Sequence, residues 1–196
     1  MHINSHKILI ISLSSILYSC SSEISPESKD DIAPQQSPSE IDKAETSLKS
    51  LDTGSTSNPL FPAEILDHKG NIVSSDKLAG KIVGIYFSAQ WCPPCRHFTP
   101  SLVEFRNKNA KEFEVVFVSS DRSSDDQLKY MEKYGMKWYT LPHGSDAANK
   151  LKKKYEVRGI PSLVIVDAKG NTITKNGRSD VSGNPSGALA NWQKKS

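Results

Sequence analysis

The sequence predicts a three-layer α/β domain, and three features of residues 59–196 support this fold class. Residues 81–88 and 114–119 are continuous apolar runs of strand length, as expected of buried strands. Stretches with helical spacing of apolar residues follow both runs. A third apolar run, residues 162–167, is followed by a turn and a short further strand. Strands that alternate with helices and then close with a hairpin indicate a β-sheet between two layers of helices.

The first half of the domain begins with a predicted β-hairpin. Apolar residues alternate on either side of a Lys69-Gly70-Asn71 turn, a pattern typical of two short antiparallel strands. The buried strand 81–88 follows. Residues 93–108 are then predicted to be helical, because their apolar side chains recur on one broad face; these side chains are Phe98, Leu102, Val103 and Phe105.

The second half of the domain repeats the alternation. After the strand 114–119, Asp121 begins a turn into a helix over residues 124–134, whose first turn carries Asp125 and Asp126. Acidic side chains are favourable there because the amide end of a helix carries partial positive charge. The remaining predicted elements are a helix over residues 145–155, strands over 162–167 and 172–175, and a terminal helix that contains 188–192.

The N-terminus has the pattern of an exported lipoprotein. Lys7 precedes an apolar run over residues 8–17, and ten helical residues span about 15 Å, half of a hydrocarbon core of about 30 Å. Residues 1–19 are therefore predicted to be a signal peptide and not a membrane-spanning helix. Residues 17–20, Leu-Tyr-Ser-Cys, resemble the bacterial lipobox, which implies cleavage before Cys20 and lipidation of its sulfur. A plain secretory signal with a chance cysteine is the alternative.

Residues 20–58 are predicted to be a flexible linker. They are rich in Ser, Pro, Glu and Asp and contain no aromatic residue, so they cannot bury enough apolar surface to offset the entropy of ordering them. This linker would hold the folded domain away from the membrane. Ser21 stands directly after the lipidated cysteine, where retention in the inner membrane often uses Asp, and this favours an outer-membrane address.

The composition gives no sign of a nucleic-acid partner or of a second domain. The formal net charge is only +3, and the lysines of residues 150–154 fit a solvated helix face. Nothing in this pattern predicts binding to nucleic acid. Residues 59–196 have the usual size of one domain and show no internal repeat. We expect this domain to be a monomer.

Cys92 and Cys95 enclose two prolines in a Cys-Pro-Pro-Cys motif, and Cys20 is the third cysteine of the chain. Cys92 lies between a buried strand and the start of a helix, whose amide end lowers the pKa of a thiol and favours the nucleophilic thiolate. Cys95, one turn later, is within reach to resolve a mixed disulfide. A structural staple is the plain alternative, but closing a four-residue loop would stabilise the fold by only roughly 2 kcal/mol.

A metal or haem site fits the motif less well. Structural zinc usually takes four ligands as two close pairs, and the chain has one such pair of cysteines. Covalent haem attachment needs a histidine directly after the second cysteine, where this sequence has Arg96. A copper chaperone is the stronger rival, because two thiols and a later histidine, here His143, suit a soft metal. We predict no metal and no cofactor beyond the cysteine pair itself.

Four sequence blocks in order carry a resemblance to a known family. They are GKIVGIYFSAQWCPPCRHFTPSLVEF, FEVVFVSSDRS with KYGMKWYTLPH, VRGIPSLVIVDAKGNTIT, and NGRSDV with a late Trp192. Together they resemble the tryparedoxin and nucleoredoxin branch of the thioredoxin family, over most of residues 60–196. The resemblance implies a thioredoxin-like three-layer fold, with a central mixed β-sheet flanked by helices. It also implies a thiol–disulfide oxidoreductase in which Cys92 attacks and Cys95 resolves.

The resemblance implies roles for residues outside the cysteine pair as well. The Ile160–Pro161 bond would be cis, which removes an N–H beside the sulfurs and leaves the Ile160 backbone free to pair with an extended substrate. An ordinary trans proline at the start of a strand is the alternative. Trp91 would shield one side of Cys92 and offer an apolar surface to partners, although a core aromatic would look the same in the sequence. Trp138 is equally compatible with the core and with a contact at the site.

Two further features bear on the expected chemistry. Typical thioredoxins carry a buried Asp six residues before the first cysteine, where this chain has Tyr86. Bulk water, or Tyr86 acting through a water molecule, are therefore the candidates for the general base. Pro93 and Pro94 carry no amide hydrogen, which removes two potential donors to the Cys92 sulfur. We therefore expect a moderately reducing pair and a reductase.

The sequence thus predicts a membrane-tethered thiol–disulfide oxidoreductase that reduces disulfides of exported proteins through a Cys92/Cys95 dithiol–disulfide cycle. Its partners would be protein disulfides and an upstream thiol reductant. The lipid on Cys20 would anchor it to the periplasmic face of the bacterial cell envelope. Two alternatives stay open: a thioredoxin-like copper chaperone and a redox-silent binding module.

Overall fold

The computed structural model describes residues 58–196. The predicted signal peptide, Cys20 and the predicted linker up to residue 57 lie outside the described residues. Asn58, which composition places in the linker, belongs to the folded domain: it is buried, and its side-chain amide donates a hydrogen bond of 2.9 Å to Asp167 O. No helix within residues 58–196 is long and apolar enough to cross a bilayer.

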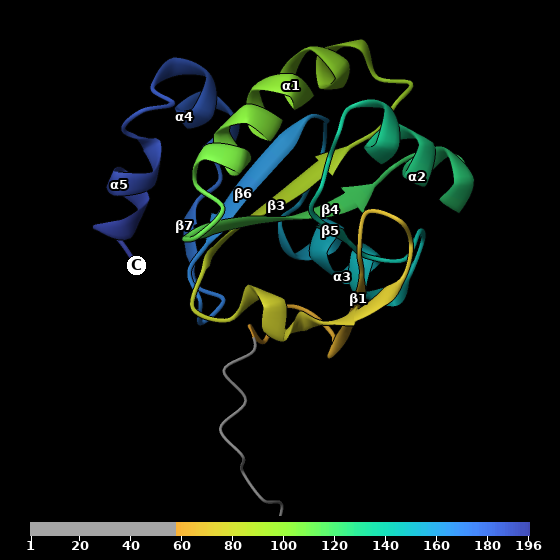
Figure 1. The fold of residues 1–196 in the computed structure, drawn as a ribbon, viewed down its shortest axis with the longest axis horizontal. Coiled ribbons are helices and arrows are strands. Elements are labelled where there is room, and N and C mark those ends of the chain that lie inside the picture. The colour runs from red at the N-terminus through yellow and green to blue at the C-terminus, as the bar shows by residue number, and fades with distance from the viewer. Residues whose placement is uncertain (1–57) are drawn as a thin grey trace, which may run out of the picture. The chain divides into compact units, whose positions relative to one another are not determined.

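A seven-stranded mixed sheet forms the centre of the part of the chain that the structure describes (Figure 1). Its strands are β1 Glu64–Leu66, β2 Ile72–Ser74, β3 Ile82–Ser88, β4 Phe113–Ser119, β5 Tyr139–Thr140, β6 Ser162–Val166 and β7 Thr172–Thr174. They lie in the order β2-β1-β5-β4-β3-β6-β7. β4 is parallel to β3 and to β5, whereas β6 is antiparallel to β3 and to β7. All seven residues of β3 and of β4 are buried, as their continuous apolar pattern predicts.

Helices cover the sheet and complete the predicted layers. They are the 3-10 helix η1 Ser75–Leu78 and the α-helices α1 Pro93–Lys108, α2 Ser124–Lys133, α3 Asp146–Lys154, α4 Gly177–Gly183 and α5 Ala188–Gln193. Apolar side chains of α1, α2, α4 and α5 share one core cluster with the sheet. Those of η1 and α3 belong to a second cluster, together with residues of β1. In Figure 1, α1 runs in much the same direction as β3 and β6. The predicted α/β fold class is confirmed.

The structure adds three short elements that the sequence did not predict: η1, β5 and α4. β5 has two residues, too few for a period to be visible, and pairs with β4 through Val116 opposite Tyr139. α4 begins and ends with glycine, and its one apolar residue is Val181. Trp138, which the sequence could not place, is only 2% exposed and packs edge-on against Tyr86 with ring centroids 6.3 Å apart. It is a core residue.

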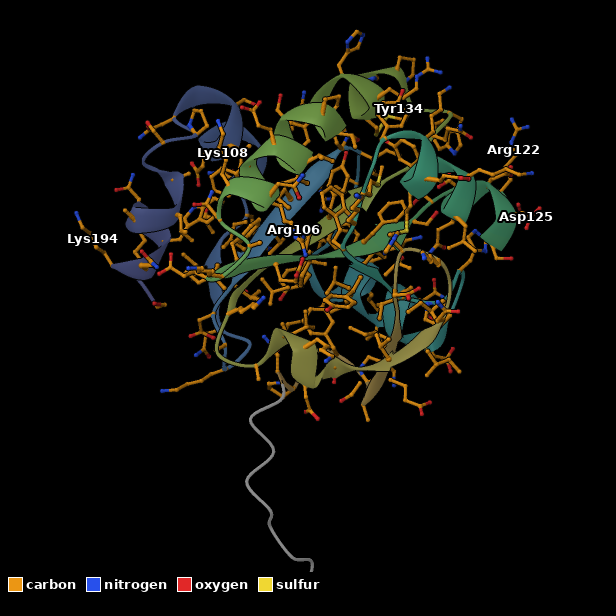
Figure 2. The ribbon with its side chains drawn as sticks, viewed as in Figure 1. Arg106, Lys108, Arg122, Asp125, Tyr134 and Lys194 are labelled. Atoms are coloured by element: carbon orange, nitrogen blue, oxygen red, sulfur yellow. A yellow bond between two sulfur atoms is a disulfide. The ribbon has the colours of Figure 1, made fainter. Side chains whose placement is uncertain are left out.

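A buried ion pair ties α1 to β4. Arg106, labelled in Figure 2, lies on α1. It donates two hydrogen bonds to Glu114, from Nε to Oε1 at 2.8 Å and from Nη2 to Oε2 at 2.7 Å. The Glu114 side chain is 2% exposed, and Lys81 Nζ lies 3.9 Å from its Oε2. Because Arg106 bonds to both carboxylate oxygens, it compensates the buried negative charge of Glu114. This contact fixes the C-terminal half of α1 on the sheet that carries the cysteine motif.

Candidate redox site

The Cys-Pro-Pro-Cys motif forms the beginning of α1. Cys92 is the N-cap residue, with extended backbone angles of φ −88° and ψ 110°, and the prolines occupy the first two helical positions. Proline is favourable there because its missing N–H has no partner in the first turn. The Arg96 N–H already bonds to Cys92 O at 3.2 Å. Pro93 and Pro94 have no N–H, so the Cys95 N–H is the one amide donor of the first turn that has no backbone partner within the described residues.

Cys92 and Cys95 are joined in a disulfide, with their Cα atoms 5.2 Å apart. Cys92 keeps 4% of its surface exposed, whereas Cys95 is completely buried. Ala89 and Ile160 pack against the pair and form a small apolar cluster with it. Any reagent that approaches from solvent therefore meets Cys92 first.

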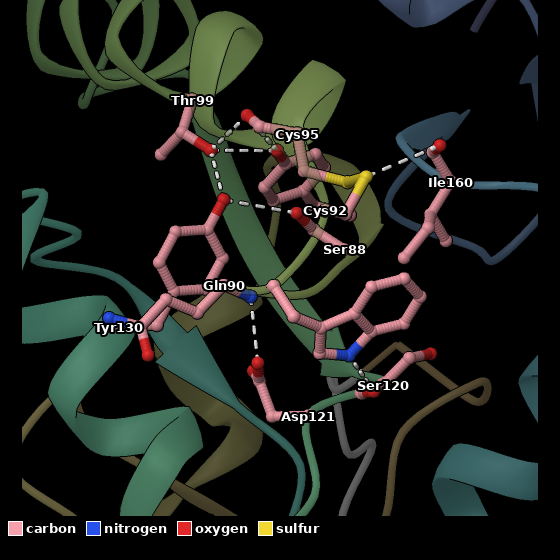
Figure 3. The surroundings of a disulfide bond; sticks show 11 residues. Ser88, Gln90, Cys92, Cys95, Thr99, Ser120, Asp121, Tyr130 and Ile160 are labelled. Atoms are coloured by element: carbon pink, nitrogen blue, oxygen red, sulfur yellow. Dashed lines mark hydrogen bonds between the residues drawn. A yellow bond between two sulfur atoms is a disulfide. The ribbon is translucent and has the colours of Figure 1, made fainter.

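The loop before β6 lies directly against the disulfide (Figure 3). The Ile160–Pro161 peptide bond is cis, in agreement with the expectation from the sequence resemblance. Cys92 Sγ lies 3.6 Å from Ile160 O. The Ile160 N–H has no hydrogen-bond acceptor among residues 58–196. One backbone donor beside the sulfurs is therefore available to a bound chain.

The loop between β4 and α2 supports the motif from the other side. The Trp91 ring is 55% exposed, and its Nε1–H donates to Ser120 O at 2.9 Å. Asp121 is buried and accepts two hydrogen bonds, both of 2.7 Å: from Gln90 N to Oδ1 and from Ser119 Oγ to Oδ2. These contacts hold an exposed aromatic ring beside the disulfide, so Trp91 is not a core residue.

Four buried hydroxyl groups lie behind Cys95. Thr99 Oγ1 donates to Cys95 O at 2.8 Å, and it lies 2.8 Å from the Tyr86 hydroxyl and 2.7 Å from the Tyr130 hydroxyl. A threonine hydroxyl has one proton and two lone pairs. Since its proton is used on Cys95 O, Thr99 accepts from both tyrosines. The Tyr130 hydroxyl is then free to accept from Ser88 Oγ at 3.2 Å (Figure 3).

This arrangement keeps Tyr86 and Tyr130 neutral. Burial raises the pKa of Tyr86 far above its ordinary value, and burial also raises the pKa of Tyr130. The proton of each phenol is held in a hydrogen bond to Thr99. Tyr86 is therefore a hydrogen-bond donor in the core beneath Cys95, and its hydroxyl is poorly suited to remove a proton from a thiol.

The histidine considered as a copper ligand is held elsewhere. His143 Nε2 lies 2.8 Å from the backbone oxygen of Asp121. Residues 58–196 contain no group of three or more His, Cys, Asp or Glu side chains placed to hold a metal ion. Arg96 and His97 are exposed on the first turn of α1. The geometry gives the copper-chaperone alternative no support.

Sequence reasoning missed the residues that support the motif from behind and from the side. They are Ser88, Thr99, Asp121 and Tyr130. Only Thr99 had a readable signal, because it follows Cys95 by four residues and therefore lies on the same face of α1. The others come from β3, from the loop after β4 and from α2, and only the fold brings them together.

Comparisons with known proteins agree with this geometry. The family model described as "Thioredoxin-like" matches residues 80–172. A nucleoredoxin of Danio rerio is 38% identical over 132 residues, which cover 65% of this chain and 31% of that protein. The tryparedoxin of Trypanosoma brucei brucei is 42% identical over 128 residues, which cover 63% of this chain and 88% of that protein. A crystal structure of thioredoxin from Wuchereria bancrofti matches with a TM-score of 0.61 at 45% identity, covering 71% of this chain and 100% of that one.

These matches identify the family of the chain, although they cover different shares of the two relatives. It spans most of the tryparedoxin but only 31% of the length of the nucleoredoxin. The protein belongs to the thioredoxin-like family, in its tryparedoxin and nucleoredoxin branch.

Proposed function

We propose that this protein is a membrane-tethered thiol–disulfide oxidoreductase that reduces disulfides of exported proteins with the Cys92/Cys95 pair. One observation carries the proposal: the disulfide sits at the start of α1 with Cys92 Sγ 3.6 Å from Ile160 O, next to the cis Pro161. Membership of the tryparedoxin and nucleoredoxin branch supports the same chemistry.

The different exposure of the two cysteines supports their separate roles. In the reduced protein the Cys92 thiolate attacks one sulfur of a substrate disulfide, forms a mixed disulfide and releases the other sulfur as a thiolate. Cys95, which is completely buried, then loses its proton and attacks the Cys92 sulfur. The Cys92–Cys95 disulfide forms, and the second substrate thiol leaves. Two electrons have passed to the substrate, and an upstream dithiol restores the pair.

The surroundings of the pair suit an extended polypeptide substrate. The Ile160 N–H has no acceptor within the described residues, and it can pair with a substrate carbonyl in the manner of a β-strand. The exposed Trp91 ring gives an apolar surface beside the pair. Because burial keeps Tyr86 neutral, bulk water is the better of the two candidates for the base that takes the proton of Cys95 in the resolving step.

The prolines support reduction as the direction of the cycle. A thiolate at Cys92 has one first-turn amide, that of Cys95, to stabilise it. With few donors the thiolate is stabilised less and the reduced form is favoured less, which is the property of a reductant and not of a strong oxidant.

The tether rests on the lipobox-like residues 17–20. Lipidation of Cys20 should put the protein in the membrane fraction, since several acyl chains anchor firmly whereas one binds only marginally. Cys20→Ala should release it as soluble material. A wild-type protein that is found in the soluble fraction would contradict the tether and leave the redox chemistry untouched.

Trapping tests the activity and the substrate class together. Cys95→Ser removes the resolving thiol, so Cys92 should stay joined to its substrates as mixed disulfides that dithiothreitol releases. Mass spectrometry of the released partners should identify exported proteins that contain disulfides. Cys92→Ser is the matched control and should capture none. Equal capture by the two variants would exclude Cys92 as the attacking thiol.

A further inference from the structure

Four of the five arginines in this chain lie around the redox disulfide. The sequence holds 25 basic residues, and five of them are arginines. Arg106 is committed to the buried pair with Glu114. The other four come from different elements: Arg96 from α1, Arg122 from the loop after β4, Arg158 from the loop before β6, and Arg178 from α4. We call these four residues the arginine ring.

The cavities and the loops place the arginine ring at the site. Arg96 and Arg122 line a cavity of about 270 Å³ together with Trp91. Arg178 lines a second cavity, of about 480 Å³, together with Pro93 and Pro94 of the motif. Arg158 stands two residues before Ile160, whose carbonyl oxygen touches the Cys92 sulfur. Arginines from three elements therefore line the two cavities beside the motif, and Arg158 lies in the loop that contacts the Cys92 sulfur.

The four guanidinium groups are exposed and have no partner in the described part of the chain. None of them forms an ion pair or a side-chain hydrogen bond with residues 58–196, in contrast to Arg106. Figure 2 shows the Arg122 side chain extending away from the fold. Guanidinium groups that stabilise nothing within the domain are available to a bound molecule.

Acidic side chains cancel only part of this charge. Two carboxylates, Asp121 and Asp126, share the first cavity with Arg96 and Arg122. Asp121 is buried and already accepts hydrogen bonds from Gln90 N and Ser119 Oγ. The second cavity has His97 and Arg178 among its lining residues and no carboxylate. The two cavities together therefore hold three arginines against two carboxylates, one of which is buried and already hydrogen-bonded.

We propose that the arginine ring docks an acidic segment of a protein substrate, with carboxylates on both sides of the cysteine that Cys92 attacks. The proposal rests on the proposed function and names its substrate class. Arginine suits this task because its planar group pairs with a carboxylate through two hydrogen bonds. The ring spans two separate cavities and the cis-proline loop, an extent that fits a polypeptide and exceeds a small disulfide. Its charge would also attract an acidic partner during encounter.

Matched peptides test the proposal with the full-length protein. Three peptides differ only in the four residues that flank a single cysteine, which are Asp, Asn or Lys, and each cysteine carries thionitrobenzoate through a disulfide. The reduced Cys92 thiolate attacks the peptide sulfur and releases thionitrobenzoate as a coloured thiolate. Cys95 then closes the Cys92–Cys95 disulfide and releases the peptide thiol. The absorbance gives the second-order rate constant.

The Asp peptide should react about tenfold faster than the Asn peptide at low ionic strength, because steering of opposite charges raises association rates by 10-fold or more. The Lys peptide should be slowest. Salt at about 0.5 M should remove most of the difference, since it shortens the range of the interaction to a few ångströms.

Charge reversal with a matched control distinguishes an effect of the arginine ring from an effect of the protein's net charge. Arg122→Glu with Arg158→Glu should abolish or reverse the preference for the Asp peptide. Lys194→Glu with Lys195→Glu changes the net charge equally, at the other end of the domain (Figure 2), and should keep the preference. Arg122→Lys with Arg158→Lys should keep part of it.

The outcomes distinguish the two proposals. Release from none of the peptides would contradict the proposed function. Release at equal rates from all three, or equal loss of preference in the lysine control, would overturn the arginine ring alone. Absence of peptide preference, together with binding to phosphatidylglycerol vesicles that Arg122→Glu with Arg158→Glu abolishes, would assign the ring to a membrane surface and overturn substrate docking.

Discussion

Restoring one amide at the start of α1 should make the cysteine pair more oxidising. The N-cap side chain accepts hydrogen bonds from the amides of the second and third helical residues. Here the second is Pro94, which has no N–H, and the third is Cys95. Pro94→Ala therefore adds a donor at the position from which it can reach the Cys92 sulfur. Pro93→Ala is the matched control, since it loosens the same turn but restores the first amide, which points along the helix axis.

The size of the effect follows from the strength of one hydrogen bond. A bond to a charged group is worth about 1.5–3 kcal/mol, and the extra backbone freedom offsets up to about 1 kcal/mol. A net gain of about 1–2 kcal/mol lowers the pKa of Cys92 by about one unit. It also raises the reduction potential by about 20–40 mV, because 30 mV corresponds to about 1.4 kcal/mol for this couple.

Two assays measure these changes. Thiolate absorbance against pH gives the pKa, and equilibration with glutathione at about pH 9, above the ordinary thiol pKa of about 8.5, gives the potential with the thiolate populated. Pro93→Ala should change both quantities less than Pro94→Ala does. If Pro94→Ala leaves the pKa unchanged or raises it, the missing amides do not control the potential, and the preference for a reductase loses its physical basis.

The core around the site gives three further predictions. Thr99→Val removes the short-range partner that two buried tyrosine hydroxyls share, and leaves them only the longer contacts of Tyr86 with Cys95 O and of Tyr130 with Ser88. It should cost about 2 kcal/mol of unfolding free energy in urea, whereas Thr99→Ser should recover most of it. Because burial raises the pKa of Tyr86, the folded state holds the phenol proton more tightly than the unfolded chain does. The free energy of unfolding should therefore fall as the pH rises above about 10. In Tyr86→Phe it should fall less steeply. Arg106→Ala removes the arginine partner of the buried Glu114 carboxylate and should cost about 3 kcal/mol of unfolding free energy. Lys108→Ala breaks an exposed pair on the same helix and should cost almost nothing. Equal loss in the last two variants would contradict the burial argument.

Long periodic segments made most of the fold readable from the sequence. The predicted helix over residues 93–108 has the observed bounds, and the strands β3, β4 and β6 lie where continuous apolar runs were found. Short elements carry too few residues to show a period, and η1, β5 and α4 were missed for that reason. Their positions depend on the neighbouring strand and helix, which the local sequence does not specify.

The site was readable only where the motif is local. Cys92, Cys95 and Pro161 stand in recognisable patterns, and the structure brings the two cysteines next to the loop that carries Pro161. The hydroxyl group of Tyr130, in α2, bonds to Thr99 from more than 30 residues away in sequence, and Asp121 bonds to Gln90 from the loop after β4. No spacing rule connects such residues, because their proximity is a property of the sheet order.

The claim that Cys92 attacks and Cys95 resolves is tested most directly by turnover of insulin disulfides in the presence of dithiothreitol. The wild-type protein should accelerate insulin reduction, and Cys20→Ala should match it, because Cys20 lies outside the motif. Cys95→Ser should lose turnover yet form a stable mixed disulfide with one insulin chain, located at Cys92 by mass spectrometry. Cys92→Ser should be inactive. A Cys92→Ser protein that reduces insulin at the wild-type rate would contradict the account.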